Sequence, residues 1–275
     1  MATNDLDSTT VRGPSGPVHS HIARPAGLSP FPAIVLLQEG LGVTGHLLGL
    51  AKRLAGEGFF TLVPDLYSHD KARRSLGDDE VVRWLPLARA LNRDALLASL
   101  SERDAESARR VIAWFAGRDT STYLPDVQAA VAHLKRHPEV RPEAIASIGF
   151  SLGGGLSAQL AASGADLAAG IIFYGSAPPV DQLRGVRYPL QGHYADHDAA
   201  ITPNVPAFEA ALRAAGKSFS AFVYPGTEHG FFNETRSAFH APSADLALLR
   251  SLAFLREHLG RTEGLPIAQT ASARV

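Results

Sequence analysis

The sequence predicts a doubly wound α/β fold, in which a mostly parallel β-sheet carries helices on both faces. Short runs rich in isoleucine, valine and leucine recur along the chain, and segments with helical periodicity separate them. Strands that alternate with helices pair in parallel through right-handed crossovers, so both faces of the sheet become covered. With 275 residues, 45% of them hydrophobic, the chain is long enough to bury a large core in one compact domain.

Six apolar runs are the predicted strands. The first, residues 32–38, reads Pro-Ala-Ile-Val-Leu-Leu-Gln, a composition typical of a strand that is buried on both faces. In a parallel sheet, ligands bind beyond the carboxyl ends of the strands, so residues that directly follow a strand are the candidates for chemistry. The other predicted strands are residues 59–63, 144–149, 169–174, 188–194 and 219–224.

The segments between these strands have helical periodicity. An apolar stripe in residues 45–58 consists of Leu47, Leu48, Ala51, Leu54 and Ala55, and one in residues 126–137 consists of Val127, Ala130, Val131 and Leu134. Further helices are predicted over residues 155–163, 205–215 and 243–259.

A longer segment, residues 67–122, interrupts the alternation. It contains no good strand, but Trp84, Leu85 and several further leucines lie among charged residues, which predicts a helical insertion over about residues 71–118. We expect a break near Pro86, because proline removes a helix hydrogen bond. The insertion could cap a site as a lid or form a longer crossover with its apolar face packed down. The second interpretation is favoured, since apolar stripes at helical spacing usually face the core.

Residues 18–260 are predicted to form a single domain, with a flexible polar start over residues 1–17 and a flexible tail over residues 261–275. The start lacks the positive patch and apolar run of a signal peptide. No stretch approaches the roughly 20 apolar residues of a membrane-spanning helix. We therefore expect a cytoplasmic protein that does not associate with a membrane.

Charge and cysteine content exclude several classes of function. The 26 Lys and Arg residues nearly balance the 27 Asp and Glu residues, without the basic patch that gathers nucleic acid. The absence of cysteine excludes disulfides, thiolate metal sites and a cysteine nucleophile. We expect a small neutral or weakly charged substrate, no cofactor, no metal and no nucleic acid, and a monomer or small homo-oligomer.

Ser151 is the candidate nucleophile. The segment Gly149-Phe-Ser-Leu-Gly153 directly follows a predicted strand and precedes a run that can form a helix, which is the context of a nucleophile elbow. The tight turn forces strained backbone angles on the serine, and the two glycines leave room for neighbouring chain. The helix that follows offers a free amide at Leu152 to an oxyanion. The alternative is a glycine-rich helix start with a capping serine.

A serine nucleophile needs a histidine base and an acid that orients the histidine. His229 lies just past the last predicted strand, in a glycine-containing loop. Asp198 follows the strand over residues 188–194, with Asp196 as the second choice, and the order Ser151, Asp198, His229 matches that of α/β-hydrolases. A metal cluster of His193, Asp196, His197 and Asp198 is the less favoured reading, because ligands in one loop rarely converge alone.

The loop after the first predicted strand should supply the second oxyanion donor, and the amide of Gly40 is the candidate. The neighbouring Glu39 is unusual, because a carboxylate at the end of a buried strand is costly unless it is paired or hydrogen-bonded. Glu39 is therefore expected to have a structural partner or a role near the nucleophile.

Taken together, these motifs resemble the dienelactone hydrolase family. The residues that carry the resemblance span most of positions 32–258, and are residues 36–43 with His46, residues 63–67, residues 148–154, Asp198 with Ile201, and residues 229–231. The resemblance implies an α/β-hydrolase domain without metal that hydrolyses lactones or other small esters. It also implies Ser151 as nucleophile, Asp198 and His229 as its partners, and Glu39 beside it.

Two departures from the family pattern concern the site. Well-known members carry cysteine where this chain has Ser151, and an arginine that grips a substrate carboxylate four residues after the histidine, where this chain has Asn233. The resemblance therefore does not predict dienelactone itself as the substrate. The sequence favours ester or lactone hydrolysis through a Ser-His-Asp triad. Acyl transfer or amide cleavage by the same triad, and ligand binding without catalysis, are the alternatives.

Overall fold

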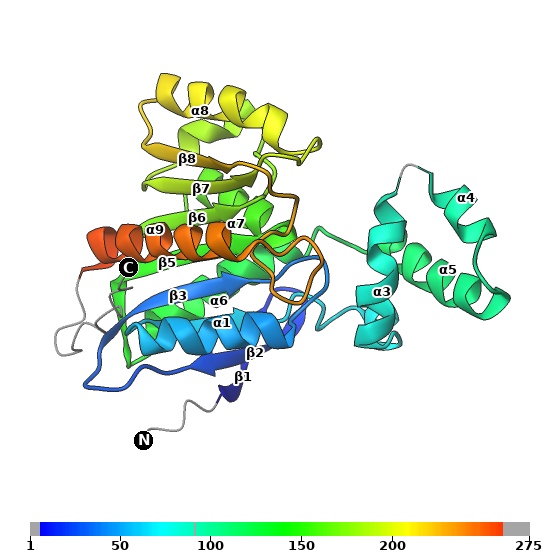
Figure 1. The fold of residues 1–275 in the computed structure, drawn as a ribbon. Coiled ribbons are helices and arrows are strands. Elements are labelled where there is room, and N and C mark those ends of the chain that lie inside the picture. Colours follow the sequence, from blue (N-terminus) through cyan, green and yellow to red (C-terminus); the bar gives the residue numbers. More distant parts are fainter. Residues whose placement is uncertain (1–5, 91, 261–275) are drawn as a thin grey trace, which may run out of the picture.

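The computed structural model describes residues 6–90 and 92–260, and its centre is an eight-stranded sheet (Figure 1). The strand order is β1-β2-β4-β3-β5-β6-β7-β8. The pairs β1–β2 and β2–β4 are antiparallel, and all other neighbours are parallel. The strands are β1 (Leu6–Gly13), β2 (Gly16–Ala23), β3 (Phe31–Leu37), β4 (Phe60–Pro64), β5 (Val140–Phe150), β6 (Ala169–Phe173), β7 (Leu190–Ala195) and β8 (Phe219–Tyr224).

Helices cover both faces of the sheet, as predicted. Helices α1 and α9 lie on the near face in Figure 1, and α6, α7 and α8 pack on the other face. The helices outside the insertion are α1 (Gly45–Gly56), α6 (Tyr123–Arg136), α7 (Leu152–Ala162), α8 (Val205–Ala214) and α9 (Ala241–Leu259), with 3₁₀ turns at Val180–Gly185 and Thr202–Asn204. The α/β fold class is thus confirmed.

Each face of the sheet has its own hydrophobic core. Side chains of β3 alternate between them, with Val35 and Leu37 in the core beneath α6 and α7, and Ile34 and Leu36 in the core beneath α1 and α9. All seven residues of β3 are buried. This two-sided burial explains why the central strands read as continuous apolar runs instead of alternating patterns.

The prediction of a flexible start over residues 1–17 is wrong for the residues that the structure describes there. Residues 6–23 form the β1–β2 hairpin at the edge of the sheet, in which Val11 and Val18 are buried opposite each other. Most other side chains of β1 face solvent, so this edge strand carries polar residues and resembles a loop in the sequence. The predicted tail, residues 261–275, lies outside the described residues.

In its described residues, the predicted helical insertion contains four helices, α2 (Lys71–Arg74), α3 (Asp78–Arg89), α4 (Arg93–Ala98) and α5 (Glu102–Gly117). Figure 1 shows α3, α4 and α5 as a group beside one end of the sheet, next to the loop between β8 and α9. Helix α3 continues through Pro86 and ends at Arg89, so the predicted break occurs three residues later than expected. Pro86 lacks the N–H that would bind the Val82 carbonyl, so α3 loses one hydrogen bond in the turn before the proline and continues for only three residues beyond it.

Two helix boundaries also differ from the prediction. Helix α6 begins at Tyr123 instead of residue 126, and α7 begins at Leu152 instead of residue 155. The early start of α7 matters, because the helix follows Ser151 without any intervening loop. Among the described residues, no helix is both long enough and apolar enough to cross a membrane.

Candidate active site

Ser151 occupies a strained turn between β5 and α7. Its φ and ψ of 53° and −107° are rare for a residue with a side chain. A Cβ atom at Gly149 would lie 1.9 Å from the Gly153 carbonyl oxygen, and one at Gly153 would lie 2.5 Å from the Leu37 carbonyl oxygen. Positions 149 and 153, on either side of Ser151, therefore admit only glycine. Without side chains there, α7 can start directly over the ends of the strands.

The three residues predicted from the sequence to act together lie in one hydrogen-bonded row. Ser151 Oγ is 2.9 Å from His229 Nε2, and His229 Nδ1 is 2.6 Å from Asp198 Oδ2. An ionised carboxylate only accepts hydrogen bonds, so the Nδ1 atom of His229 carries the proton and Nε2 is left to accept one from serine. Ser151 and Asp198 are 9% and 6% exposed, so both ends of the row are shielded from water, while the His229 side chain between them is 26% exposed.

Asp198, and not Asp196, is the aspartate that reaches His229. The other carboxylate oxygen of Asp198 accepts hydrogen bonds from the amides of Ala200 and Ile201, at 3.3 and 3.2 Å, which hold the side chain in place. Asp196 instead accepts from the amide of Gly226 at 3.2 Å, on the surface.

The alternative metal cluster in this loop is not formed. His193 is fully buried and makes hydrogen bonds with Gln191 and Tyr224, away from Asp198. Within residues 6–90 and 92–260, no group of three or more His, Cys, Asp or Glu side chains is arranged to hold a metal ion.

The two predicted oxyanion donors follow neighbouring strands. Leu152 is the first residue of α7, where backbone amides have no acceptor within the helix. Gly40 lies in a turn closed by a 3.1 Å hydrogen bond from the Gly42 amide to the Glu39 carbonyl. The hydroxyl of Tyr67 donates to the Gly40 carbonyl at 3.0 Å and so fixes the position of this turn. Because β3 and β5 pair in parallel, both amides lie at the same edge of the sheet.

Glu39 has the partners that its burial requires. The hydroxyl of Tyr174 donates to Oε1 at 3.0 Å, the amide of Asn233 donates to Oε2 at 3.1 Å, and Arg236 Nη1 lies 3.7 Å from Oε2. Burial, and then the charge of Glu39, raise the pKa of the Tyr174 phenol well above its ordinary value, so it remains a donor. The Tyr174 ring also packs against His229, with 4.9 Å between ring centroids.

Ser151, His229, Glu39 and Gly40 line a pocket of about 290 Å³. Helix α3 of the insertion forms one wall with Val82, Leu85 and Pro86, and the loop after β8 forms another with residues that include Arg236. The same helix packs against the hydrophobic core through Val81, Trp84 and Leu85, as the favoured interpretation of the insertion expects.

Sequence reasoning missed three contributions to this site. Tyr174 directly follows β6, so the rule that found the other candidates at strand ends applies to it as well. Arg236 and Val82 lie in a loop and in a surface helix, without a local pattern that marks them. The need of Glu39 for a cationic partner was the only signal that could have pointed to Arg236.

Comparisons with known proteins agree with the fold. The model of the "Dienelactone hydrolase family" matches residues 18–259. A "Putative carboxymethylenebutenolidase" from Saccharolobus solfataricus is 27% identical over 233 residues, which are 83% of this chain and 90% of that protein. A "Probable 2-oxo-3-(5-oxofuran-2-ylidene)propanoate lactonase" from a Bradyrhizobium species is 25% identical over 252 residues, which are 87% of this chain and 89% of that protein.

A solved structure has the same fold. The crystal structure of a "Putative Dienelactone Hydrolase" from Klebsiella pneumoniae superposes with a TM-score of 0.73 at 24% identity, over 92% of this chain and 98% of that chain. Because the family match spans most of the sequence, the chain belongs to the dienelactone hydrolase family and is a carboxylic ester hydrolase.

Proposed function

We propose that the protein hydrolyses small carboxylic esters or lactones through a covalent acyl-enzyme on Ser151. The observation that carries the proposal is the row of two hydrogen bonds, 2.9 Å from Ser151 to His229 and 2.6 Å from His229 to Asp198, at the wall of a pocket. This is the geometry that a serine needs in order to lose its proton as it attacks.

In the first half of the reaction, Ser151 Oγ forms a bond to the carbonyl carbon while its proton passes to His229 Nε2. Asp198 stabilises the imidazolium that results and keeps the ring oriented. The negative charge on the carbonyl oxygen is held by the amides of Leu152 and Gly40, whose fixed dipoles need no reorganisation.

The tetrahedral adduct collapses when the bond from carbon to the leaving oxygen breaks and His229 donates its proton to that oxygen. In a lactone the released hydroxyl stays attached to the acyl group. Water then attacks the acyl-enzyme with His229 as base, and collapse of the second adduct returns the proton to Ser151 and frees the acid.

The size of the pocket supports a small substrate. A volume of about 290 Å³ lies at the lower end of the range for ligand sites. The wall made by Val82, Leu85 and Pro86 is apolar, while Thr235, Arg236 and Ser237 from the loop after β8 are polar, which suits a compact acyl group with one polar end. The name of the Bradyrhizobium relative, a lactonase, supports lactones as one class to test.

Turnover of a panel of p-nitrophenyl esters and small lactones tests the proposal. We expect short acyl chains to be preferred, and Ser151→Ala and His229→Ala to lower kcat by about four to six powers of ten with an unchanged fold. Asp196→Asn is the matched control, because Asp196 does not contact His229, and its kcat should stay close to that of the wild type. Ordinary esterase activity in Ser151→Ala would contradict the mechanism.

Covalent labelling distinguishes a hydrolase from its alternatives. A fluorophosphonate probe should label the wild type at Ser151 and fail to label Ser151→Ala, whereas a protein that only binds ligands would remain unlabelled. Adding an alcohol or amine acceptor to the ester assay should leave the free acid as the main product. If acceptor esters or amides dominate, the activity is acyl transfer.

A further inference from the structure

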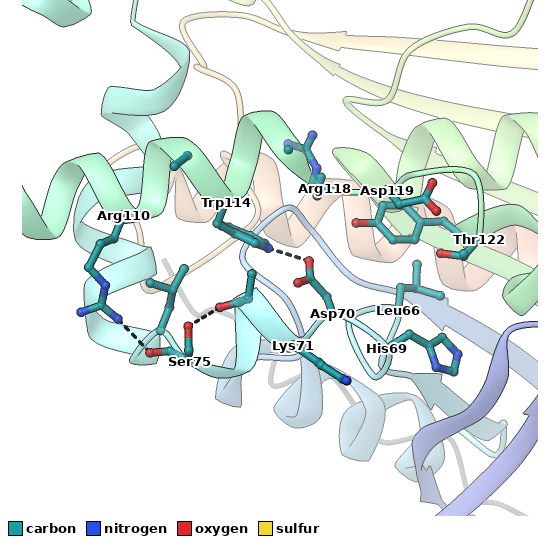
Figure 2. Close-up of a pocket in the computed structure, with 15 residues that line it drawn as sticks. Leu66, His69, Asp70, Lys71, Ser75, Arg110, Trp114, Arg118, Asp119 and Thr122 are labelled. Atoms are coloured by element: carbon teal, nitrogen blue, oxygen red, sulfur yellow. Dashed lines mark hydrogen bonds between the residues drawn. The ribbon is translucent and has the colours of Figure 1, made fainter.

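A second cavity, larger than the pocket at Ser151, lies where the helical insertion joins the sheet. Its volume is about 740 Å³, and it shares no lining residue with the pocket that contains Ser151. Figure 2 shows Trp114 of α5 and Asp70 of the loop after β4 pointing toward each other, with Leu66 farther along the same loop. Arg118, which follows α5, also lines the cavity, and its Nη1 donates to the Phe115 carbonyl. The volume is within the range of small-molecule sites.

The walls of this cavity are largely apolar. Leu66, Leu76 and Trp114 line it, and each of the three is less than 10% exposed. An indole face beside two leucine side chains favours a flat or aliphatic ligand body, because such a body removes apolar surface from water.

The two carboxylates at the cavity already have hydrogen-bond donors. Asp70 accepts from Trp114 Nε1 at 2.7 Å, which Figure 2 shows as a dashed line, and from the amide of Arg73 at 2.9 Å. Asp119 accepts from the amide and the hydroxyl of Ser121, at 2.9 and 2.6 Å. These acids therefore offer little to a cationic ligand.

The unused hydrogen-bonding groups at the cavity include two donors, besides His69 Nε2, which lies 3.5 Å from Asp126 Oδ2. Tyr123 is 2% exposed and its hydroxyl has no hydrogen-bond partner among the described residues, and the same holds for the buried Nε atom of Arg118. Burial raises the pKa of the Tyr123 phenol, so the hydroxyl keeps its proton. Lys71 adds a further cation, which forms no ion pair with a carboxylate in the described part of the chain. A buried donor without an acceptor is costly, and a ligand that carries an acceptor removes this cost.

We propose that this cavity is a second ligand site, which binds a small organic carboxylate with a flat apolar body. The apolar body packs against Trp114, and the carboxylate accepts hydrogen bonds from Tyr123 and Arg118 with Lys71 nearby. The site needs no part of the row Ser151, His229 and Asp198, so it does not depend on the function proposed above.

Tryptophan fluorescence tests the proposal, because the chain has two tryptophans and only Trp114 lines the cavity. In a Trp84→Phe background, the emission of Trp114 should change saturably on titration with benzoate. Benzamide has the same shape without the charge, and should bind at least about tenfold more weakly. Equal affinity for both probes, or no saturable change with benzoate, would overturn the proposal.

Three variants in the same background locate the binding. Tyr123→Phe removes only a hydroxyl without a partner, so the melting temperature should not fall, while the affinity for benzoate should drop about fivefold or more. Arg118→Gln should weaken benzoate binding in the same way.

Arg236→Gln is the control, because it removes a cation from the pocket at Ser151, and it should leave the affinity for benzoate unchanged. If Arg236→Gln weakens benzoate binding and the other two variants do not, benzoate binds at Ser151 and the second site is refuted. The assay needs no turnover, so neither outcome bears on the hydrolysis proposed above.

Discussion

At the scale of single residues, backbone strain is concentrated at the candidate active site. Among the described residues, Ser151 and Tyr174 are the residues other than glycine that have a positive φ, at 53° and 37°. Each directly follows a parallel strand, and each donates its backbone amide to the strand next to it, Ser151 to Phe173 and Tyr174 to His193. Such strain persists only where neighbouring structure enforces it, and here it aims one side chain at His229 and the other at Glu39.

Tyr67 offers a test of whether the turn at Gly40 contributes to catalysis. Its hydroxyl donates to the Gly40 carbonyl at 3.0 Å, so Tyr67→Phe should loosen the turn and lower kcat about tenfold, with little change in KM. The matched control is Tyr123→Phe, on a neighbouring ring whose hydroxyl has no partner, which should leave kcat unchanged. Steady-state kinetics with one ester give kcat and KM for both variants and the wild type. Equal kcat in Tyr67→Phe and the wild type would show that the turn does not need this hydrogen bond.

At the scale of elements, the sequence predicted best those segments whose environment is uniform. The central strands are buried on both faces, so apolar runs at 32–38 and 169–174 located β3 and β6 to within one residue at either end. The hairpin of β1 and β2 was missed, because an edge strand with one solvated face has polar side chains. The start of α7 was also misplaced, because Leu152, Gly153 and Gly154 have no helical pattern, and the two glycines fit against neighbouring backbone.

The turn between β5 and α7 should tolerate no side chain at its second glycine. A Cβ atom in Gly153→Ala would lie 2.5 Å from the Leu37 carbonyl and 2.7 Å from that of Gln38, so α7 would have to move away from β3. We expect a loss of about 3 kcal/mol or more in the free energy of unfolding, together with most of the activity. Urea unfolding and ester turnover measure both quantities. Gly45→Ala is the control, because a Cβ atom there meets nothing within 4 Å, and that variant should keep wild-type stability.

Helix α3 should set the size of the acyl group that the enzyme accepts. Val82 lines the pocket at Ser151 and is 43% exposed, so Val82→Trp can fill the pocket without disturbing the core. We expect kcat/KM for a hexanoate ester to fall at least about tenfold relative to that for an acetate ester. Arg83→Trp, one residue along the same helix and outside this pocket, should leave the ratio unchanged. An unchanged ratio in Val82→Trp would mean that substrates do not reach this wall.

At the scale of the whole molecule, contacts between distant parts of the chain explain which site residues the sequence could predict. Ser151, Asp198 and His229 each follow a strand, and parallel pairing brings all strand ends to one edge, so topology alone placed them together. The contact between Glu39 and Asn233 joins residues 194 positions apart. No local sequence pattern encodes such a contact. The position of Val82 in the wall of the pocket likewise depends on how the insertion packs.

A buried histidine links the stability of the whole fold to pH. His193 is fully buried in β7, where it makes hydrogen bonds with Gln191, Tyr224 and Ser251. Burial, and then the nearby charge of Arg250, lower its pKa to about 3. In the unfolded chain a histidine has a pKa of about 6.5, so between these two values the unfolded state binds a proton that the native state does not.

The contribution of neutral, buried His193 to the free energy of unfolding is therefore fully present above about pH 6.5. It declines as the pH falls from there towards 3, because protonation then favours the unfolded chain. His193 alone contributes a slope of about 1.4 kcal/mol per pH unit in that window. Burial also lowers the pKa of His133 and of His137, which steepens the decline.

Urea unfolding at pH 7.5 and pH 5.0 measures the difference in the free energy of unfolding. The variant His193→Gln should be less stable at both values, since its hydrogen bonds change, but should lose clearly less stability between them than the wild type. If both proteins lost the same stability between pH 7.5 and pH 5.0, His193 would not be a group that takes up a proton on unfolding.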